Sequence, residues 1–173
     1  LRKIRLNLER LKLMKPGLGD NYALVNVPEY TVRVIDANGT AVAMAVVVGQ
    51  RHQQTPIFSA NLSYVTLNPQ WGVPDSIAKN EVIPKLLKDP NYLKSQNMVI
   101  RTSYDLSTPA VDKDSVDWEA YITEEQNSKD MTYKFIEVPS KKNGLGRVKF
   151  IFPNKHSVYM HDTQLKHLFK RKV

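Results

Sequence analysis

The spacing of apolar residues along the chain changes several times, and each change predicts a different element. At the amino terminus, apolar side chains recur every three or four residues between basic ones, which predicts a short amphipathic helix that stops at Pro16-Gly17. Its apolar positions are Leu1, Ile4, Leu8 and Leu11. A basic helix of this kind could bind a membrane or a nucleic acid, but such a narrow apolar stripe favours packing on its own domain.

From Tyr22 onward the pattern has a period of two, which is typical of strands with one buried face. We expect strands at Tyr22–Val27, Tyr30–Ile35, Ala41–Gly49, Leu62–Leu67, Met131–Val138, Arg147–Phe152 and Ser157–His161. Residues 36–40 have turn chemistry, so the first three strands should form a β-meander. Two prolines and a tryptophan between Asn68 and Pro74 predict an irregular stretch there.

A helical pattern follows at Ser76–Asn97, where Asp89-Pro90 predicts the N-cap and first-turn proline of a second short helix. The acidic, weakly periodic segment Thr102–Asp130 predicts a loop or small subdomain over the surface that acts as a lid. Together these patterns predict a mainly β fold of two packed mixed or antiparallel sheets, with an N-terminal helix and a helical cap inserted at about residues 75–130. The length of 173 residues suits a single domain, residues 1–173.

Composition narrows the classes of function. The net charge of +8, from 25 Lys and Arg against 17 Asp and Glu, suits an acidic partner such as a nucleic acid, an anionic membrane surface or an anionic cell-wall polymer. A solvated basic surface without a specific partner explains the charge equally well. The longest apolar stretch, Ala41–Val48, is too short to cross a bilayer, so we expect no transmembrane segment in this chain. The absence of cysteine excludes disulfides, thiolate metal sites and a cysteine nucleophile within these residues.

Cofactor and nucleic-acid motifs are weak in this sequence. Gly144-Leu145-Gly146 lacks the further glycine and the strand-to-helix context of a dinucleotide-binding loop. The spacing of the four histidines, His52, His156, His161 and His167, does not match a helical zinc site. We therefore expect neither a metal nor another cofactor. Aromatic residues in strands could stack on bases, but they are more typical of a core, so nucleic-acid binding is a minor alternative.

The most informative chemical feature is His161-Asp162, an ionisable pair at the end of an apolar strand. A histidine there can present a neutral imidazole near pH 7, and an adjacent acceptor can determine which ring nitrogen carries the proton. This arrangement suits a general base. From spacing alone, a structural histidine that is hydrogen-bonded in a turn is the more common interpretation.

A series of short motifs, spread in order over nearly the whole chain, resembles the L,D-transpeptidase (YkuD-like) catalytic domain. The resemblance is closest to the large periplasmic branch whose catalytic domain carries a helical capping subdomain. The motifs are Asn26-Val27-Pro28, Val48-Gly49, residues 54–59, 68–74, 143–146 and 149–154, and Tyr159-Met160-His161-Asp162-Thr163.

The resemblance implies that the strand ending at His161 leads to a Ser-His/Ser-Gly-Cys-Ile/Val-Arg motif, which carries the nucleophile. That motif is absent from this sequence, which stops at Val173, 12 positions after His161. Leu1 in place of a methionine also suggests an internal or processed piece. We expect a catalytic domain that is incomplete at its carboxyl end, rather than a homologue that lacks the cysteine.

The family chemistry implies a role for four residues. His161 would be the general base, and Asp162 or its backbone carbonyl would orient the ring. Tyr159 and Trp71 would line the substrate cleft, although both could instead be core aromatics. The implied reaction forms 3-3 cross-links between donor and acceptor peptidoglycan stem peptides in the periplasm or cell envelope, with carbapenems as inhibitors. A catalytically inactive wall-binding or scaffold module of the same fold is the alternative.

Overall fold

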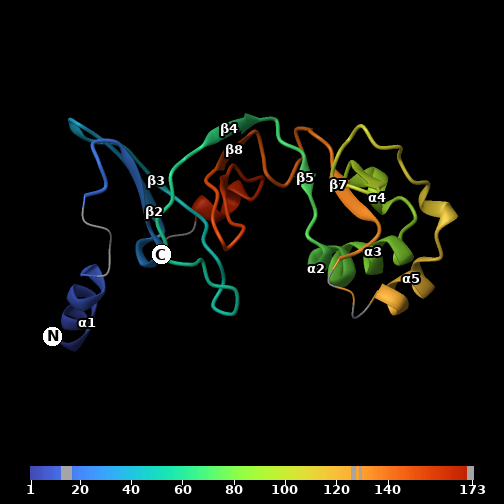
Figure 1. Ribbon diagram of the computed structural model, residues 1–173, viewed down its shortest axis with the longest axis horizontal. Coiled ribbons are helices and arrows are strands. Elements are labelled where there is room, and N and C mark those ends of the chain that lie inside the picture. The colour runs from blue at the N-terminus through green and yellow to red at the C-terminus, as the bar shows by residue number, and fades with distance from the viewer. Residues whose placement is uncertain (13–16, 126–127, 129, 171–173) are drawn as a thin grey trace. The chain divides into compact units, whose positions relative to one another are not determined.

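The computed structural model describes residues 1–12, 17–125, 128 and 130–170, and the structural statements below concern these residues. The chain divides into two compact units, which are described separately (Figure 1). The first unit comprises Leu1–Ala60 with Lys166–Val173, and the second comprises Asn61–Leu165. That residues 1–173 act as one catalytic domain therefore stays a prediction.

The first unit contains a helix and a three-stranded antiparallel meander. Its strands are β1 (Tyr22–Asn26), β2 (Thr31–Asp36) and β3 (Gly39–Ala45), in the order β1-β2-β3, with the short 3-10 helices η1 (Val27–Glu29) and η5 (Lys166–Lys170). The predicted meander is confirmed. In the β2–β3 turn, the Asp36 carboxylate accepts a hydrogen bond from the Asn38 N–H at 2.8 Å, and Gly39 has a φ of +112° that favours glycine.

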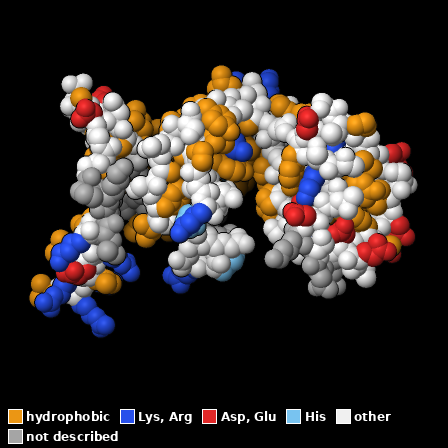
Figure 2. All heavy atoms as spheres, viewed as in Figure 1, with side chains coloured by type: hydrophobic (Ala, Val, Ile, Leu, Met, Phe, Trp, Pro, Cys, Tyr) orange, Lys and Arg blue, Asp and Glu red, His pale blue; other side chains and the backbone are white. Residues whose placement is uncertain are grey.

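Helix α1 (Arg2–Leu11) confirms the amphipathic helix expected at the amino terminus. Both basic and hydrophobic side chains of this helix are visible in Figure 2. None of its ten residues is buried, and Ile4 and Leu8 are 62% and 55% exposed. The predicted packing of this apolar stripe on its own domain is therefore not found among the described residues. The proline expected to stop the helix, Pro16, lies outside them.

The second unit contains two further antiparallel sheets. One has the order β4-β8-β9, from β4 (Tyr64–Leu67), β8 (Val148–Ile151) and β9 (Met160–His161). The other has the order β5-β7-β6, from β5 (Trp71–Gly72), β7 (Lys134–Glu137) and β6 (Met98–Arg101). The mainly β class is confirmed, with the strands divided among three small sheets. Strand β5 lies in the stretch that was expected to be irregular. A strand is possible there because its two residues, which lie between the flanking prolines, pair with β7.

Several short helices, together with strand β6, lie in the segment expected to form the cap. The helices are α2 (Asp75–Ile77), the π-helix η2 (Ala78–Val82), α3 (Ile83–Lys88), α4 (Tyr92–Ser95), the 3-10 helix η3 (Lys113–Ser115) and α5 (Trp118–Glu124). The helical segment predicted at 76–97 is confirmed. The N-cap of α4 is Asn91 rather than the expected Asp89, whose carboxylate instead accepts the Asn91 N–H at 2.9 Å in the preceding turn.

The main hydrophobic core lies between these helices and the β5-β7-β6 sheet. In Figure 1, α2, α3 and α5 lie along one side of β7. Val73, Ile83 and Phe135 are completely buried in this core. Trp118 and Tyr121 of α5 also belong to it, so the acidic segment expected to form a surface loop or lid contributes its own apolar face to the interior. The Trp118 indole N–H donates to the Lys113 carbonyl at 2.8 Å, which satisfies its polar atom.

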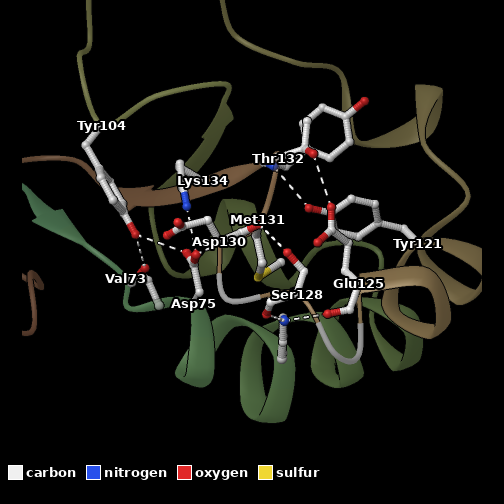
Figure 3. A network of polar contacts seen from close by, with 12 residues as sticks. Val73, Asp75, Tyr104, Tyr121, Glu125, Ser128, Asp130, Met131, Thr132 and Lys134 are labelled. Atoms are coloured by element: carbon white, nitrogen blue, oxygen red, sulfur yellow. Dashed lines mark hydrogen bonds and ion pairs between the residues drawn. The ribbon is translucent and has the colours of Figure 1, made fainter.

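A partly buried ion pair joins the start of the helical segment to the sheet. The Asp75 carboxylate accepts hydrogen bonds from Lys134 Nζ at 2.7 Å and from the Met131 N–H at 2.8 Å (Figure 3). The side chains of Asp75 and Lys134 are only 16% and 15% exposed. Burial alone would raise the pKa of Asp75, but the hydrogen bonds from Lys134 and Met131 outweigh it and lower this pKa below its ordinary value. Asp75 is therefore a charged anchor between α2 and β7.

We expect Asp75→Asn to lower the free energy of unfolding by about 2–4 kcal/mol at pH 7, because Lys134 loses its anionic partner in a partly buried site. A carboxylate whose pKa is lowered by folding stabilises the protein above its unfolded-state pKa, and this contribution is lost as the pH falls through its folded-state pKa. The stability difference between the wild type and Asp75→Asn should thus shrink below about pH 4.

Urea unfolding at pH 7 and pH 3 measures this difference. Glu124→Gln, which removes a charge from an exposed position of α5, is the matched control and should change stability little at either pH. A difference of the same size at both pH values would contradict the assignment.

Candidate active site

The candidate site is built around His161, the last residue of β9. Its ring nitrogen Nδ1 lies 2.5 Å from the backbone carbonyl oxygen of Asp162. Since a carbonyl oxygen can only accept, Nδ1 must be the donor, and in a neutral imidazole Nε2 is then the nitrogen that can take a proton. The histidine side chain is exposed, so Nε2 can reach a reacting group. This is the geometry that a general base requires.

Asp162 holds the main chain on both sides of this contact. Its carboxylate accepts the Thr163 N–H at 2.7 Å and the Arg147 N–H at 3.2 Å, and its own N–H donates to the Val148 carbonyl at 2.9 Å. Of the two orienting groups considered from the sequence, the Asp162 carbonyl lies within hydrogen-bond distance of the imidazole Nδ1. The carboxylate fixes the loop that follows His161 to the start of β8.

Gly146 makes the close approach of Asp162 possible. It has a φ of +65°, a conformation that favours glycine, and a Cβ atom built on it would lie 2.5 Å from Asp162 Oδ2 and 2.6 Å from Asp162 Cβ. Any other residue at 146 would therefore displace the Asp162 side chain. The Gly-Leu-Gly sequence is a requirement of this packing and not part of a nucleotide-binding loop.

Tyr159 and Trp71, the two residues expected to line the cleft, lie together in the second unit. The centroid of the Tyr159 ring is 5.7 Å from that of His161, and the Tyr159 hydroxyl forms a side-chain hydrogen bond with Trp71, whose indole N–H is the donor. Burial raises the pKa of Tyr159, and the hydrogen bond from Trp71 partly offsets this rise. All four residues singled out from the sequence thus belong to one connected cluster. An open depression of about 280 Å³ adjoins Tyr159 and is lined by residues 151–154 and 157–159.

Two buried polar residues support this cluster and have no role predicted from the sequence. Glu137 of β7 pairs with Trp71 across the sheet, is 6% exposed, and accepts the Gly144 N–H at 3.1 Å. Burial raises the pKa of Glu137, and the Gly144 hydrogen bond partly opposes this rise. The fully buried Asn143 donates to the carbonyls of Glu137 and Val138 and accepts the Leu145 N–H at 2.8 Å.

Gly144 lies between Glu137 and Trp71. A Cβ atom built on Gly144 would be 3.3 Å from Glu137 Oε2 and 3.4 Å from Trp71 Cε3. The loop at 143–146 therefore packs on Trp71 at one end and on Asp162 at the other. The sequence motif Asn143-Gly144-Leu145-Gly146 indicated that this loop is important. No sequence pattern indicated a role for Glu137, because it is a single glutamate in an apolar strand.

Lys149 of β8 is a further residue of this cluster that the sequence did not single out. It is paired with His161 across the β8–β9 ladder, and its Nζ lies 3.8 Å from the centroid of the Tyr159 ring. Burial lowers the pKa of Lys149. The lysine, the tyrosine and the histidine thus share one face of the sheet.

Metal sites and membrane-spanning helices are two further possibilities for the part of the chain that the structure describes. It contains no group of three or more His, Cys, Asp or Glu side chains placed to hold a metal ion. None of its helices combines the length and apolar character that are needed to span a membrane. What the cluster can do chemically is to accept a proton at His161 Nε2 beside an aromatic, positively charged surface.

Comparison with known proteins identifies the family. The model of the YkuD family, the L,D-transpeptidase catalytic domain, matches residues 20–173. A Haemophilus influenzae protein, provisionally named as an L,D-transpeptidase, is 30% identical over 170 residues. That alignment covers 98% of this chain and 32% of the relative, so the chain spans about a third of the relative's length. The chain belongs to the L,D-transpeptidase catalytic-domain family, and the family predicted from its motifs is confirmed.

We expect Gly146→Ala to destabilise the protein by about 2–4 kcal/mol, because it combines a strained positive φ with a clash against Asp162. Gly19→Ala is the matched control, since Gly19 has a φ of +83° but open space around its Cβ position, and it should cost only about 1 kcal/mol. Thermal unfolding measures the cost, and nitrogen NMR of the His161 ring should show a changed balance between Nδ1-H and Nε2-H only in Gly146→Ala. Equal effects of the two substitutions would contradict the packing argument.

Proposed function

We propose that this chain is part of a peptidoglycan L,D-transpeptidase that forms 3-3 cross-links through a cysteine thioester. The observation that supports this most directly is the His161 ring, whose Nδ1 is bound by the Asp162 carbonyl and whose Nε2 is left to act as a base. Family membership supports the reaction class, and the contact at Nδ1 supports Nε2 as the nitrogen that would act as the base. The 173 residues contain no cysteine, so the nucleophile is not among them.

In the first half of the proposed reaction, His161 Nε2 takes the proton of the cysteine thiol. The thiolate attacks the carbonyl carbon of the donor's third residue, a carbon–sulfur bond forms, and the amide carbon–nitrogen bond to the fourth residue breaks. The proton held on Nε2 passes to the departing nitrogen. The D-amino acid leaves with a free amine, and the rest of the donor stays on the enzyme as a thioester.

In the second half, the side-chain amine of an acceptor stem attacks the thioester carbonyl. A carbon–nitrogen bond forms and the carbon–sulfur bond breaks, while His161 Nε2 takes the proton that the amine loses and returns it to the sulfur. The Asp162 carbonyl stabilises the imidazolium at Nδ1 in both halves, as the orienting acceptor does in other nucleophile–histidine pairs. Asp162 is thus a positioning residue.

Tyr159 and Trp71 are proposed to line the donor cleft. Their hydrogen bond ties an aromatic wall from β5 to the segment that enters β9, so that a bound stem would contact a rigid surface next to His161. The helical segment at about residues 75–130 would cap this cleft and exclude water. The location that fits this reaction is the bacterial periplasm or cell envelope, and carbapenems, which acylate such a nucleophile, are the expected inhibitors.

The alternative is a catalytically inactive wall-binding or scaffold module. The absence of cysteine from these residues is the observation that favours it. The sequence of the parent gene after Val173 discriminates between the two functions. A Gly-Cys-Ile/Val-Arg motif there supports the enzyme, whereas a sequence without it supports the module.

We expect residues 1–173 to form no covalent adduct with a carbapenem and to show no transpeptidase turnover, because no residue present replaces a thiolate opposite His161. A version extended beyond Val173 by the connecting segment and cysteine motif of the family should gain both activities. In that version His161→Ala should slow acylation by about 100-fold or more, whereas His167→Ala, in η5, should leave it nearly unchanged.

Intact-protein mass after incubation with a carbapenem measures acylation in all four proteins. The His167→Ala protein also serves as the control for loss of a histidine as such. An adduct on the cysteine-free chain, or equal acylation rates in the two histidine variants, would contradict the catalytic assignment.

A further inference from the structure

Lys149 is a cation inside the candidate site, and it lies beside the Tyr159 ring. Among the residues that the structure describes, its ammonium forms no ion pair and no hydrogen bond, and its contact is with the face of the Tyr159 ring at 3.8 Å. A cation–π contact at a partly exposed position compensates only part of the cost of removing an ammonium from water. The lowered pKa of Lys149 reflects that uncompensated burial.

The position of this ammonium relative to His161 is set by the sheet. Lys149 and His161 are directly opposite each other in the β8–β9 ladder, so their side chains leave the same face. Both side chains contact Tyr159, with the ammonium 3.8 Å and the imidazole centroid 5.7 Å from its ring centroid. The ammonium is therefore at most about 10 Å from the base, within the span of two or three backbone residues.

The proposed reaction places an anion in this region. The donor bond that breaks joins the third residue to a fourth residue, which leaves as a free amino acid and so carries the terminal carboxylate of the stem. That carboxylate is a single residue away from the reacting carbonyl, a distance of about 4 Å along the chain. An ammonium with three N–H donors is the complementary group for a carboxylate, and their hydrogen bonds are charge-assisted.

We propose that Lys149 binds the terminal carboxylate of the donor stem and thereby selects stems that end at the fourth residue. This inference rests on the proposed transpeptidase function and adds a specificity-determining residue to it. Tyr159 then has two roles, because its ring face holds the ammonium while its hydroxyl is bound by Trp71. A longer stem would place a neutral amide, in place of the carboxylate, next to the Lys149 ammonium. The longer stem would therefore bind less tightly.

The 173-residue chain is suited to test this proposal, because without the nucleophile it can bind a donor without consuming it. The probes are a synthetic stem tetrapeptide ending in D-alanine and the same peptide with its terminal carboxylate converted to a carboxamide. Ligand-observed NMR titration gives the dissociation constant of each. We expect the wild type to bind the acid about 5- to 20-fold more tightly than the amide.

Three variants assign this preference to the lysine. Lys149→Met should bind the acid as weakly as the amide while keeping the wild-type affinity for the amide, which shows that the site is still folded. Lys149→Arg, which keeps the charge, should retain most of the preference. Lys141→Met, which removes an exposed lysine from the loop before β8, should behave as the wild type.

The possible failures are distinguishable. If the wild type binds acid and amide equally, or if Lys149→Met still prefers the acid, the role of Lys149 is wrong and the proposed function stands. If the wild type binds neither peptide, the proposed function is itself overturned, and the role of Lys149 with it.

Discussion

Asp162 joins three neighbouring segments, and the position of His161 depends on these contacts. Its N–H pairs with β8, its carboxylate holds the backbone of Arg147 and Thr163, and its carbonyl accepts the imidazole Nδ1 proton. This arrangement requires a residue without a side chain at 146, since a Cβ atom built on Gly146 would lie 2.5 Å from Asp162 Oδ2. A strand of only two residues, β9, can therefore hold a well-oriented histidine, because the orientation comes from hydrogen bonds around Asp162 and not from a long ladder.

Burial and chemistry are located in different parts of the second unit. The helices and the β5-β7-β6 sheet enclose the main apolar core, whereas Tyr64, Val65 and Leu67 of β4 are largely exposed. The candidate site is connected to the buried part through Trp71, which pairs with Glu137 on one side and binds the Tyr159 hydroxyl on the other. The packing of the helical segment and the position of Trp71 and Tyr159 should thus be coupled. The Asp75–Lys134 ion pair belongs to the part that contains the main core.

The candidate site was partly predictable, because some of its residues belong to recognisable motifs. His161 and Asp162 could be found from an ionisable pair at a strand end, and Trp71 and Tyr159 from the motifs that contain them. Lys149 and Glu137 could not, because a lone charged residue within a strand has the same pattern whether it faces solvent or a site. Their significance comes from partners outside their own strands. Lys149 contacts Tyr159 and is paired with His161, and Glu137 is paired with Trp71 and binds Gly144.

The sequence by itself determined the class of fold, the meander, the amino-terminal helix, the helical segment after Pro74 and the family, because each rests on local periodicity or on short contiguous motifs. Only the tertiary structure decided the short strands β5 and β6, since two to four residues are too few to show a period and pair only when β7 lies beside them. It also decided that Trp118 and Tyr121 are core residues, because their acidic neighbours lower the average hydrophobicity of α5 while one face of the helix is buried. The contact between the Asp162 carbonyl and the His161 ring was likewise tertiary, because the position of Asp162 depends on Gly146 and Arg147, which are 15 or 16 positions away in the chain.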